Sequence, residues 1–335
     1  MIPVQHTINT PYVIGQVHCY TAELGGELVL FDTGPATLEA QQYLQKNIDL
    51  RRLKHVVITH CHIDHYGQAA WLGRNSDAVI YLPEKDCLKI NGHAGRMEQM
   101  FQLLIELGFG REYLSQLRKI FDSGAIFPPF PEDYLTTETD LPDYLGIEVV
   151  GCPGHSQSDL VFTGDDWAIT GDTLLRGVFQ SPVLDLDMEV GGRFNNYKAY
   201  CRTLQKLASL RSRTVLPGHR QSIKSVDTTL LFYISKMLSR ASQLHPYRGE
   251  ENLFLIIENL FGERAPDVFH IYLKFSELLF LKDFLKEPGL LRDSLETIGL
   301  FEEVSPLYYQ AVGDEVISST MQSLSSREKQ INDRI

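Results

Sequence analysis

The sequence predicts an α/β protein that ends in an all-helical region. Up to about residue 225 of 335, short β-branched or apolar runs alternate with stretches whose apolar residues recur at helical spacing. From about residue 226 only the helical spacing remains. With 43% hydrophobic and 22% charged residues, the composition is typical of a folded globular chain and excludes a mostly disordered one.

The N-terminal part of the chain carries the first strands of this pattern. The pair Gly25-Gly26 separates two apolar runs and predicts a turn between two strands. Thr37 precedes a helical pattern and is a suitable N-cap. The predicted elements, in order, are strands at 13–20 and 28–31, a helix at 37–46, a strand at 55–59, a short helix at 67–72 and a strand at 78–82.

A helical segment interrupts the strands that follow. Leucine and methionine residues over 84–122 recur at helical spacing, and Gly108 and Gly110 divide them into a predicted hairpin. A run rich in proline and phenylalanine follows at 127–131. The pattern then predicts strands at 147–150, 160–162, 167–170 and 214–216, and a helix at 197–210.

These patterns predict the domain organisation. We expect an α/β domain over 1–225, with a helical insertion at about 84–140, and a C-terminal helical region over 226–320. The candidate helices of the C-terminal region are 230–244, 252–261 and 268–286, and we expect 321–335 to form a flexible tail.

Charge and cysteine content limit the class of partner and the compartment. The net charge of −12 gives no general attraction to nucleic acid or to an anionic membrane. Five cysteines without a CxxC pair favour a reducing interior over a disulfide framework. The first residues do not read as a secretory signal, and no apolar stretch approaches the length of about 20 residues that spans a bilayer. We therefore expect a cytoplasmic protein without membrane contact.

The segment from Thr59 to Gly67 concentrates side chains that bind metals. His60, His62, Asp64 and His65 fall within six positions, directly after a hydrophobic strand. Imidazole and carboxylate groups suit zinc and neighbouring metals. His60 and His62 are alternate residues, so both point to one side of the chain. Asp64 and His65 can turn to another side, so one segment could supply ligands to two metals.

Three later segments repeat this arrangement of a strand followed by a turn. His155 follows the strand at 147–150, Asp172 follows 167–170 and His219 follows 214–216, and a glycine precedes each of the three residues. Four strand ends would thus bring five histidines and two aspartates to one rim of the molecule.

The same segments resemble the motifs of the metallo-β-lactamase superfamily. Thr59-His60-Cys61-His62-Ile63-Asp64-His65 resembles the superfamily signature, the three later segments match its remaining motifs in order, and Asp32-Thr33-Gly34 resembles an early Asp-Thr-Gly element. The resemblance covers residues 10–225 and implies a four-layer αβ/βα sandwich. It implies one metal on His60, His62 and His155, a second on Asp64, His65 and His219, Asp172 bridging them, and Asp32 supporting a ligand from behind.

Within the superfamily the residues are most similar to those of the hydrolytic, glyoxalase II-like members. The commonest dinuclear β-lactamases have Cys in place of Asp172, and flavodiiron oxidoreductases have Glu in place of His62. The helical C-terminal region resembles two groups of β-lactamase-like proteins: endoribonucleases with a small helical tail, and a thioesterase whose C-terminal helices cap the metal site.

The resemblance implies metal-dependent hydrolysis. We expect a metal-bridging hydroxide to attack an ester, thioester or lactone of a small, partly apolar substrate, with Asp64 and Asp172 as catalytic residues. Two divalent ions are expected, Zn²⁺ first and Fe or Mn as alternatives. The insertion and the C-terminal helices could form a lid whose apolar side chains hold the substrate, or these side chains could form the insertion's own core. The side chains in question are Met97, Met100, Phe101, Phe109, Phe127 and Phe130.

Two other functions stay open. The first is an RNA or phosphodiester hydrolase, for which Arg51-Arg52-Leu53-Lys54 and the group Arg211, Arg213 and Arg220 are the local basic residues. The second is a non-enzymatic regulator that binds a partner through residues 226–335. The sequence does not determine the oligomeric state, for which a dimer is one possibility.

Overall fold

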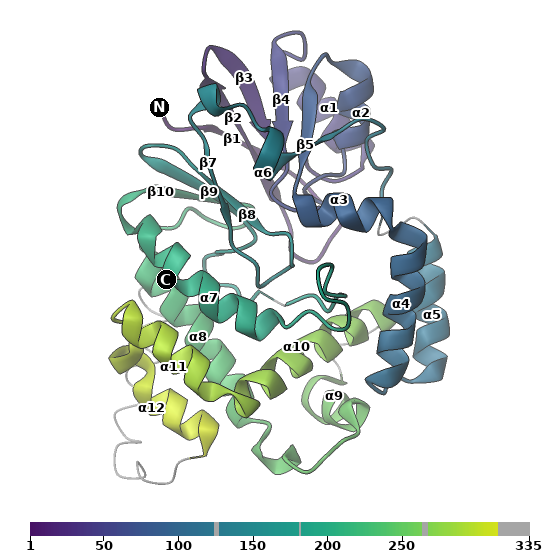
Figure 1. Ribbon diagram of the computed structural model, residues 1–335, viewed down its shortest axis with the longest axis vertical. Coiled ribbons are helices and arrows are strands. Elements are labelled where there is room, and N and C mark those ends of the chain that lie inside the picture. Colours follow the sequence, from purple (N-terminus) through teal and green to yellow (C-terminus); the bar gives the residue numbers. More distant parts are fainter. Residues whose placement is uncertain (124–126, 181, 263–266, 314–335) are drawn as a thin grey trace.

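The computed structural model describes residues 1–123, 127–180, 182–262 and 267–313. Two β-sheets lie face to face, and helices cover the outer side of each, so the α/β prediction is confirmed (Figure 1). The predicted flexible tail at 321–335 lies outside the described residues. Among the described helices, none combines the length and apolar content needed to cross a bilayer.

The first sheet has six strands in sequence order. Strands β1 to β3 pair antiparallel, and β3 to β6 pair parallel. The strands are β1 (Val4–Ile8), β2 (Val17–Leu24), β3 (Glu27–Phe31), β4 (Leu53–Val57), β5 (Val79–Leu82) and β6 (Leu135–Thr136). Helices α1 (Leu38–Asn47) and α2 (Ala69–Asn75) pack on its outer face, where Leu44 and Leu72 join Val56 in a buried core.

The second sheet has four strands in the order β10-β9-β8-β7. They are β7 (Glu148–Gly151), β8 (Leu160–Thr163), β9 (Trp167–Gly171) and β10 (Thr214–Pro217). Helices α7 (Asn196–Ala208) and α8 (Val226–Ser242) lie on its outer side. Between the sheets, the ring of Phe31 contacts those of Phe162 and Trp167 at centroid distances of 5.5 and 5.8 Å. The result is four layers: helices, sheet, sheet, helices.

Three helices follow β5 in the segment expected to be a helical insertion, where the sequence predicted a hairpin of two. They are α3 (Glu84–Asn91), α4 (His93–Glu106) and α5 (Arg111–Asp122), and a short helix α6 (Thr137–Asp140) follows β6. The predicted glycine turn joins α4 to α5, where Gly108 adopts a φ of +83° that favours glycine. The hairpin of α4 and α5 projects from the side of the sandwich (Figure 1).

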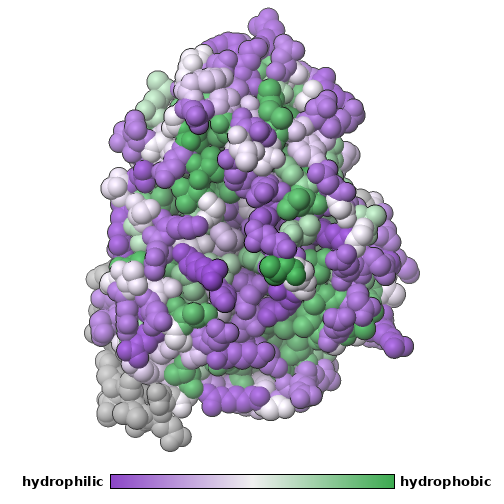
Figure 2. Space-filling model, viewed as in Figure 1, coloured by the Kyte–Doolittle hydropathy of each residue, from purple (hydrophilic) through white to green (hydrophobic). Residues whose placement is uncertain are grey.

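The C-terminal region packs on the second sheet's helices. Its helices after α8 are α9 (Leu253–Phe261), α10 (Val268–Lys286), α11 (Pro288–Thr297) and α12 (Phe301–Val312). Helix α10 contacts α7 and α8 at one end of its path and α5 at the other, so it connects the C-terminal region to the insertion. On the face seen in Figure 2, polar side chains dominate and apolar ones form small separate groups, one of them between α4 and α10.

Several elements differ from the sequence prediction. The strand expected at 13–20 begins at Val17, because residues 12–15 form a turn in which Gly15 N–H donates to the Tyr12 carbonyl at 3.0 Å. Strand β4 ends at Val57 rather than 59, because the Thr59 N–H donates to the Asp32 carboxylate and not to a neighbouring strand. Strand β1 and helices α11 and α12 had no predicted counterpart.

Candidate metal centre

The seven predicted ligands come together at one rim of the sandwich. His60, His62, Asp64 and His65 follow β4, and the loop after β7 supplies His155. Asp172 follows β9 directly, and His219 comes two residues after β10. Their ligand atoms form three overlapping groups in which the atoms lie within 4.8 Å of one another: His60 with His62 and His155, His60 with His65 and Asp172, and Asp64 with His65 and His219.

The first group consists of three imidazole rings. His62 Nδ1 lies 3.0 Å from His60 Nε2 and 2.9 Å from His155 Nε2. Burial and the neighbouring imidazoles hold the pKa of His60 well below its usual value and lower that of His62 to about 3. These two rings are therefore neutral at physiological pH, which is the form that coordinates a metal.

The other two groups share His65, and together they place the carboxylates of Asp64 and Asp172 beside the imidazoles of His65 and His219. Asp64 Oδ2 lies 3.3 Å from His219 Nε2. Asp172 Oδ1 lies 3.4 Å from both His65 Nε2 and His219 Nε2, and its Oδ2 lies 3.8 Å from His155 Nε2. Asp172 thus faces His155 of the first group as well as His65 and His219.

The protonation of His65 and His219 tests whether a cation fits here. His65 Nδ1 donates to Asp32 Oδ2 at 2.8 Å, and His219 Nδ1 donates to the Gln16 carbonyl at 2.7 Å. In a neutral ring the Nε2 atom then carries a lone pair, which faces the acceptor oxygen Asp172 Oδ1. Within the described part of the chain, none of these three buried atoms makes a hydrogen bond. Buried lone pairs that converge without a donor fit a bound cation.

The pKa shifts of His65 and Asp172 give a further indication that a cation fits here. Although burial disfavours a charged ring, the carboxylates of Asp172, Asp32 and Asp64 raise the pKa of His65 well above its usual value. Although burial opposes it, the imidazoles of His219 and His65 lower the pKa of Asp172, because the carboxylates favour the protonated form of both rings wherever no cation balances the negative charge. The carboxylates therefore create a negative potential strong enough to hold positive charge in a buried place, and a divalent cation meets that need.

Asp32 holds His65 from behind the site. Its backbone adopts a φ of +56°, a conformation uncommon for residues other than glycine. In this position the carboxylate accepts from His65 Nδ1 through Oδ2, and from the Thr59 N–H through Oδ1 at 2.8 Å. Asp32 therefore fixes both the tautomer of His65 and the backbone that leads into His60.

Gly218 leaves the space that two candidate ligands occupy. A Cβ atom at this position would lie 2.7 Å from His65 Cε1 and 2.9 Å from Asp172 Oδ1. We expect Gly218→Ala to displace one of these side chains and to weaken metal binding about 10- to 100-fold, as loss of a supporting contact does elsewhere. Metal titration of the purified variant measures this.

Gly151→Ala is the matched control for this substitution. Gly151 ends strand β7, as Gly218 directly follows strand β10, and a Cβ at Gly151 would meet no atom within 4 Å. Equal metal affinity in Gly218→Ala and Gly151→Ala would contradict the steric argument.

A cavity of about 560 Å³ opens beside the candidate ligands. His62, Asp64, His155 and Asp172 line it on one side. Apolar side chains of the insertion and of α10 line much of the rest, among them Met97, Met100, Phe121, Phe127, Phe269 and Leu273. Both regions expected to form a lid therefore contribute to the wall.

The apolar residues expected in the lid separate into two sets. Met97, Met100, Phe127 and Phe130 line the cavity. Phe101 and Phe109 instead belong to the core between helices, where Phe109 contacts Phe254 and Phe275 at centroid distances of 5.3 and 5.2 Å. Met100 also belongs to that buried core, so the set is divided between the cavity wall and the helical core. That the lining side chains hold a substrate stays a prediction.

Comparison with known proteins identifies the family. The model of the metallo-beta-lactamase superfamily matches residues 12–219, which is more than half of the chain. The chain belongs to the metallo-β-lactamase superfamily. The matched segment ends at His219, so the superfamily domain contains all seven candidate ligands, whereas α10 lies beyond it.

Relatives in the superfamily resemble most of the chain. "Probable metallo-hydrolase YqjP" of Bacillus subtilis is 26% identical over 276 residues, which are 76% of this chain and 83% of that protein. "Beta-lactamase-like protein 2 homolog" of Drosophila melanogaster is 23% identical and covers 70% of each chain. A crystal structure of a metallo-beta-lactamase family protein from Thermus thermophilus matches with a TM-score of 0.66 at 23% identity, over 86% of this chain and 94% of that one. The likeness in fold to the Thermus thermophilus structure covers more of the chain than the family match does.

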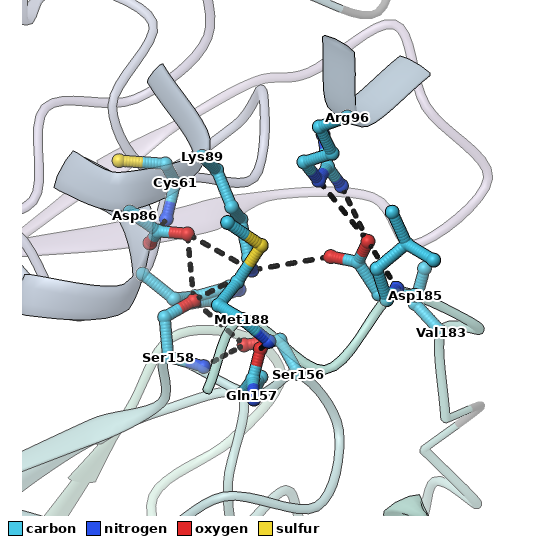
Figure 3. A network of polar contacts seen from close by, with 12 residues as sticks. Cys61, Asp86, Lys89, Arg96, Ser156, Gln157, Ser158, Val183, Asp185 and Met188 are labelled. Carbon is cyan, nitrogen blue, oxygen red and sulfur yellow. Dashed lines mark hydrogen bonds and ion pairs between the residues drawn. The ribbon is translucent and has the colours of Figure 1, made fainter. Parts of the chain in front are cut away.

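A polar network not foreseen from the sequence lies in the cavity wall (Figure 3). Asp86 on α3 accepts from the N–H of Cys61, between His60 and His62, at 2.7 Å, and from the Ser158 hydroxyl at 2.7 Å. Lys89 lies between Asp86 and Asp185. In this member of the superfamily, the insertion is therefore tied to two of the loops that carry candidate ligands. The only sign of this network in the sequence is that Asp86 and Lys89 are three residues apart, a spacing that is common on solvated helices.

Proposed function

We propose that this chain is a metal-dependent hydrolase that acts on an ester, thioester or lactone of a small, partly apolar substrate. One observation carries the proposal. A cluster of imidazole and carboxylate groups whose arrangement suits a bound cation forms one side of an otherwise largely apolar cavity. A substrate whose reacting carbonyl lies at the cluster would place its apolar part in the cavity. The superfamily membership and the relative named as a probable metallo-hydrolase support the same reaction class.

The proposal assigns two metal sites. The first would be held by His60, His62 and His155, and the second by Asp64, His65 and His219, with Asp172 between them. Two divalent ions, Zn²⁺ in the first instance and Fe or Mn as alternatives, would supply an activated water molecule and polarise the scissile carbonyl.

The chain's own residues would prepare this chemistry. Asp64 and Asp172 have lowered pKa values despite their burial, because His65 and His219 face them, so both are ionised at neutral pH. An ionised carboxylate oxygen can accept the proton of an attacking water molecule. Asp32 keeps the proton of His65 on Nδ1 and leaves Nε2 directed at the site. The apolar wall keeps bulk water from the bound acyl group.

Elemental analysis combined with a substrate panel tests the proposal. We expect protein purified without chelator to hold up to two metal ions per chain, and to hydrolyse a carboxylic ester, thioester or lactone. Activity should fall with chelation and return with Zn²⁺, Fe²⁺ or Mn²⁺. Equal, negligible turnover of ester, thioester and phosphodiester substrates with and without metal would overturn the proposal.

The same panel separates the alternatives. An RNA hydrolase would bind single-stranded RNA with an affinity that falls steeply as salt rises. The local basic residues give this reading little support, because Arg52 pairs with Glu23 at 2.7 Å and Arg211 with Asp227 at 2.7 Å. A non-enzymatic regulator would keep its cellular effect when His62 is replaced by Ala.

A further inference from the structure

The charged part of the cavity wall is electrically balanced. Apart from the candidate metal ligands and two histidines, the charged side chains that line the cavity in the described part of the chain are two carboxylates, Asp86 and Asp185, and two cations, Lys89 and Arg96. All four come from outside the metal-binding loops: three from helices α3 and α4, and Asp185 from the segment before α7. In isolation, a lysine and an arginine in such a wall would indicate a site for a substrate anion.

Lys89 is paired with groups of the wall itself. Its Nζ forms ion pairs with Asp86 Oδ1 at 3.1 Å and Asp185 Oδ2 at 3.3 Å, and donates to Ser158 Oγ at 3.3 Å, so two carboxylates already balance its charge. Although burial lowers it, the two carboxylates raise the pKa of Lys89, and the group stays charged at neutral pH. Its side chain is only 13% exposed.

Arg96 is likewise paired with a carboxylate. Its Nε and Nη2 donate to Asp185 Oδ1 at 3.2 and 2.7 Å (Figure 3). Its Nη1 contacts the sulfur of Met97 at 3.8 Å. A substrate anion that recruited Arg96 would displace Asp185 and leave a buried carboxylate with less compensation, which is strongly unfavourable.

The two histidines that line the cavity, His93 and His270, do not make the net charge of this wall positive. Burial and the nearby Arg96 lower the pKa of His93, so that ring is neutral at pH 7. His270 Nδ1 lies 2.8 Å from Asp267 Oδ2, so a carboxylate accompanies it as well. Tyr272 presents its ring, because its hydroxyl donates to the Leu184 carbonyl.

We propose that the cavity takes the neutral, apolar acyl group of the substrate and rejects acyl groups that carry a second carboxylate. This inference rests on the proposed hydrolase function and deepens it. The charged residues of the wall pair with one another, so they offer no unpaired charge to a substrate. The apolar part of the wall is formed by Met97, Met100, Phe121, Phe269 and Leu273. The cavity volume of about 560 Å³ lies in the range of pockets that bind small organic molecules. The polar or charged part of the substrate is then the leaving group, which lies outside the cavity.

Matched thioesters of N-acetylcysteamine test the inference with the metal-loaded, full-length protein. Octanoyl and 7-carboxyheptanoyl thioesters have the same chain length and the same neutral leaving group, and they differ by one terminal carboxylate. We expect kcat/KM to be at least about 100-fold higher for octanoyl, and higher for octanoyl than for acetyl. Equal values for the two eight-carbon substrates, or for octanoyl and acetyl, would overturn the inference and leave the hydrolase proposal intact.

Two substitutions that change the net charge of the network in opposite directions distinguish an electrostatic effect from structural damage. Asp185→Asn leaves the network with one net positive charge, and Arg96→Met leaves it with one net negative charge. We expect the ratio of kcat/KM for octanoyl to that for 7-carboxyheptanoyl to fall at least about 10-fold in Asp185→Asn, because a buried cation that has lost its partner attracts the terminal carboxylate. We expect the same ratio to rise in Arg96→Met, because a buried carboxylate that has lost its partner repels it. A structural effect alone would move the ratio in the same direction in both variants and would contradict the proposal.

Steric filling of the cavity gives an independent measurement. We expect Met97→Trp to lower the octanoyl-to-acetyl ratio about 10-fold, whereas Gln102→Trp, on the exposed side of the same helix, leaves it unchanged. Calorimetric binding of octanoate and suberate to the metal-loaded protein does not depend on turnover. Octanoate should bind at least about 10-fold more tightly, and equal affinities would overturn the inference even if no thioester is hydrolysed.

Discussion

Replacing Asp172 by asparagine is expected to abolish most activity and to reduce the metal content. Asp172 Oδ1 lies 3.4 Å from the Nε2 atoms of His65 and His219, and its Oδ2 faces His155, so this carboxylate adjoins candidate ligands of both proposed metal sites. The amide removes a negative charge and places an N–H donor among lone pairs. We expect kcat/KM to fall by about 10²–10³-fold and elemental analysis to show less than the wild-type metal content.

Asp165→Asn controls for the loss of one negative charge elsewhere. Asp165 lies exposed in the turn between β8 and β9, a few residues before Asp172. It should retain wild-type metal content and activity. Full metal binding in Asp172→Asn would show that the carboxylate is not a ligand and would refute the proposed centre.

Replacing Asp32 by asparagine is expected to weaken the site without removing a ligand. Asparagine tolerates the φ of +56° at this position, so the backbone conformation can persist. One amide orientation keeps an acceptor for the Thr59 N–H and then turns its NH₂ toward His65 Nδ1. The proton of His65 would move to Nε2, where it blocks coordination, and we expect metal affinity to fall about 10- to 100-fold.

Thr59→Val distinguishes the tautomer effect from a loss of local structure. The Thr59 hydroxyl contacts the Asp32 carboxylate at 2.9 Å, but it does not determine the proton on His65. We expect this variant to lose thermal stability and yet keep the His65 tautomer, as read by ¹⁵N imidazole shifts. Identical tautomers in wild type and Asp32→Asn would contradict the explanation.

The sequence predicted the candidate ligands because each follows a recognisable strand. The apolar runs before His60, His155, Asp172 and His219 indicated strand ends, and strand ends at one edge of a sandwich lie close together. The glycines between strand and ligand carried further information, since at Gly218 a side chain would collide with His65 and Asp172.

The cavity wall could not be predicted in the same way. Helix α4 is apolar on more than one face, so its spacing does not separate Met97 and Met100, which line the cavity, from Phe101, which packs into the helical core. The partners of Lys89 and Arg96 lie on different segments, and Asp185 is 89 residues from Arg96 along the chain. Such long-range pairs leave no periodic signal. Helices α11 and α12 were missed. Pro306 lies inside α12, where a proline argues against a helix, whereas Pro288 begins α11, where a proline favours a helix start.

The position of α10 has a consequence for any attempt to isolate a minimal enzyme. The family match ends at His219, which suggests an obvious place to cut the gene. Yet Tyr200 and Leu204 of α7 share one buried core with Phe280 and Leu281 of α10. A shortened protein would expose that apolar face to water and lose one side of the cavity beside the candidate ligands, so the matched segment does not form an independent folding unit.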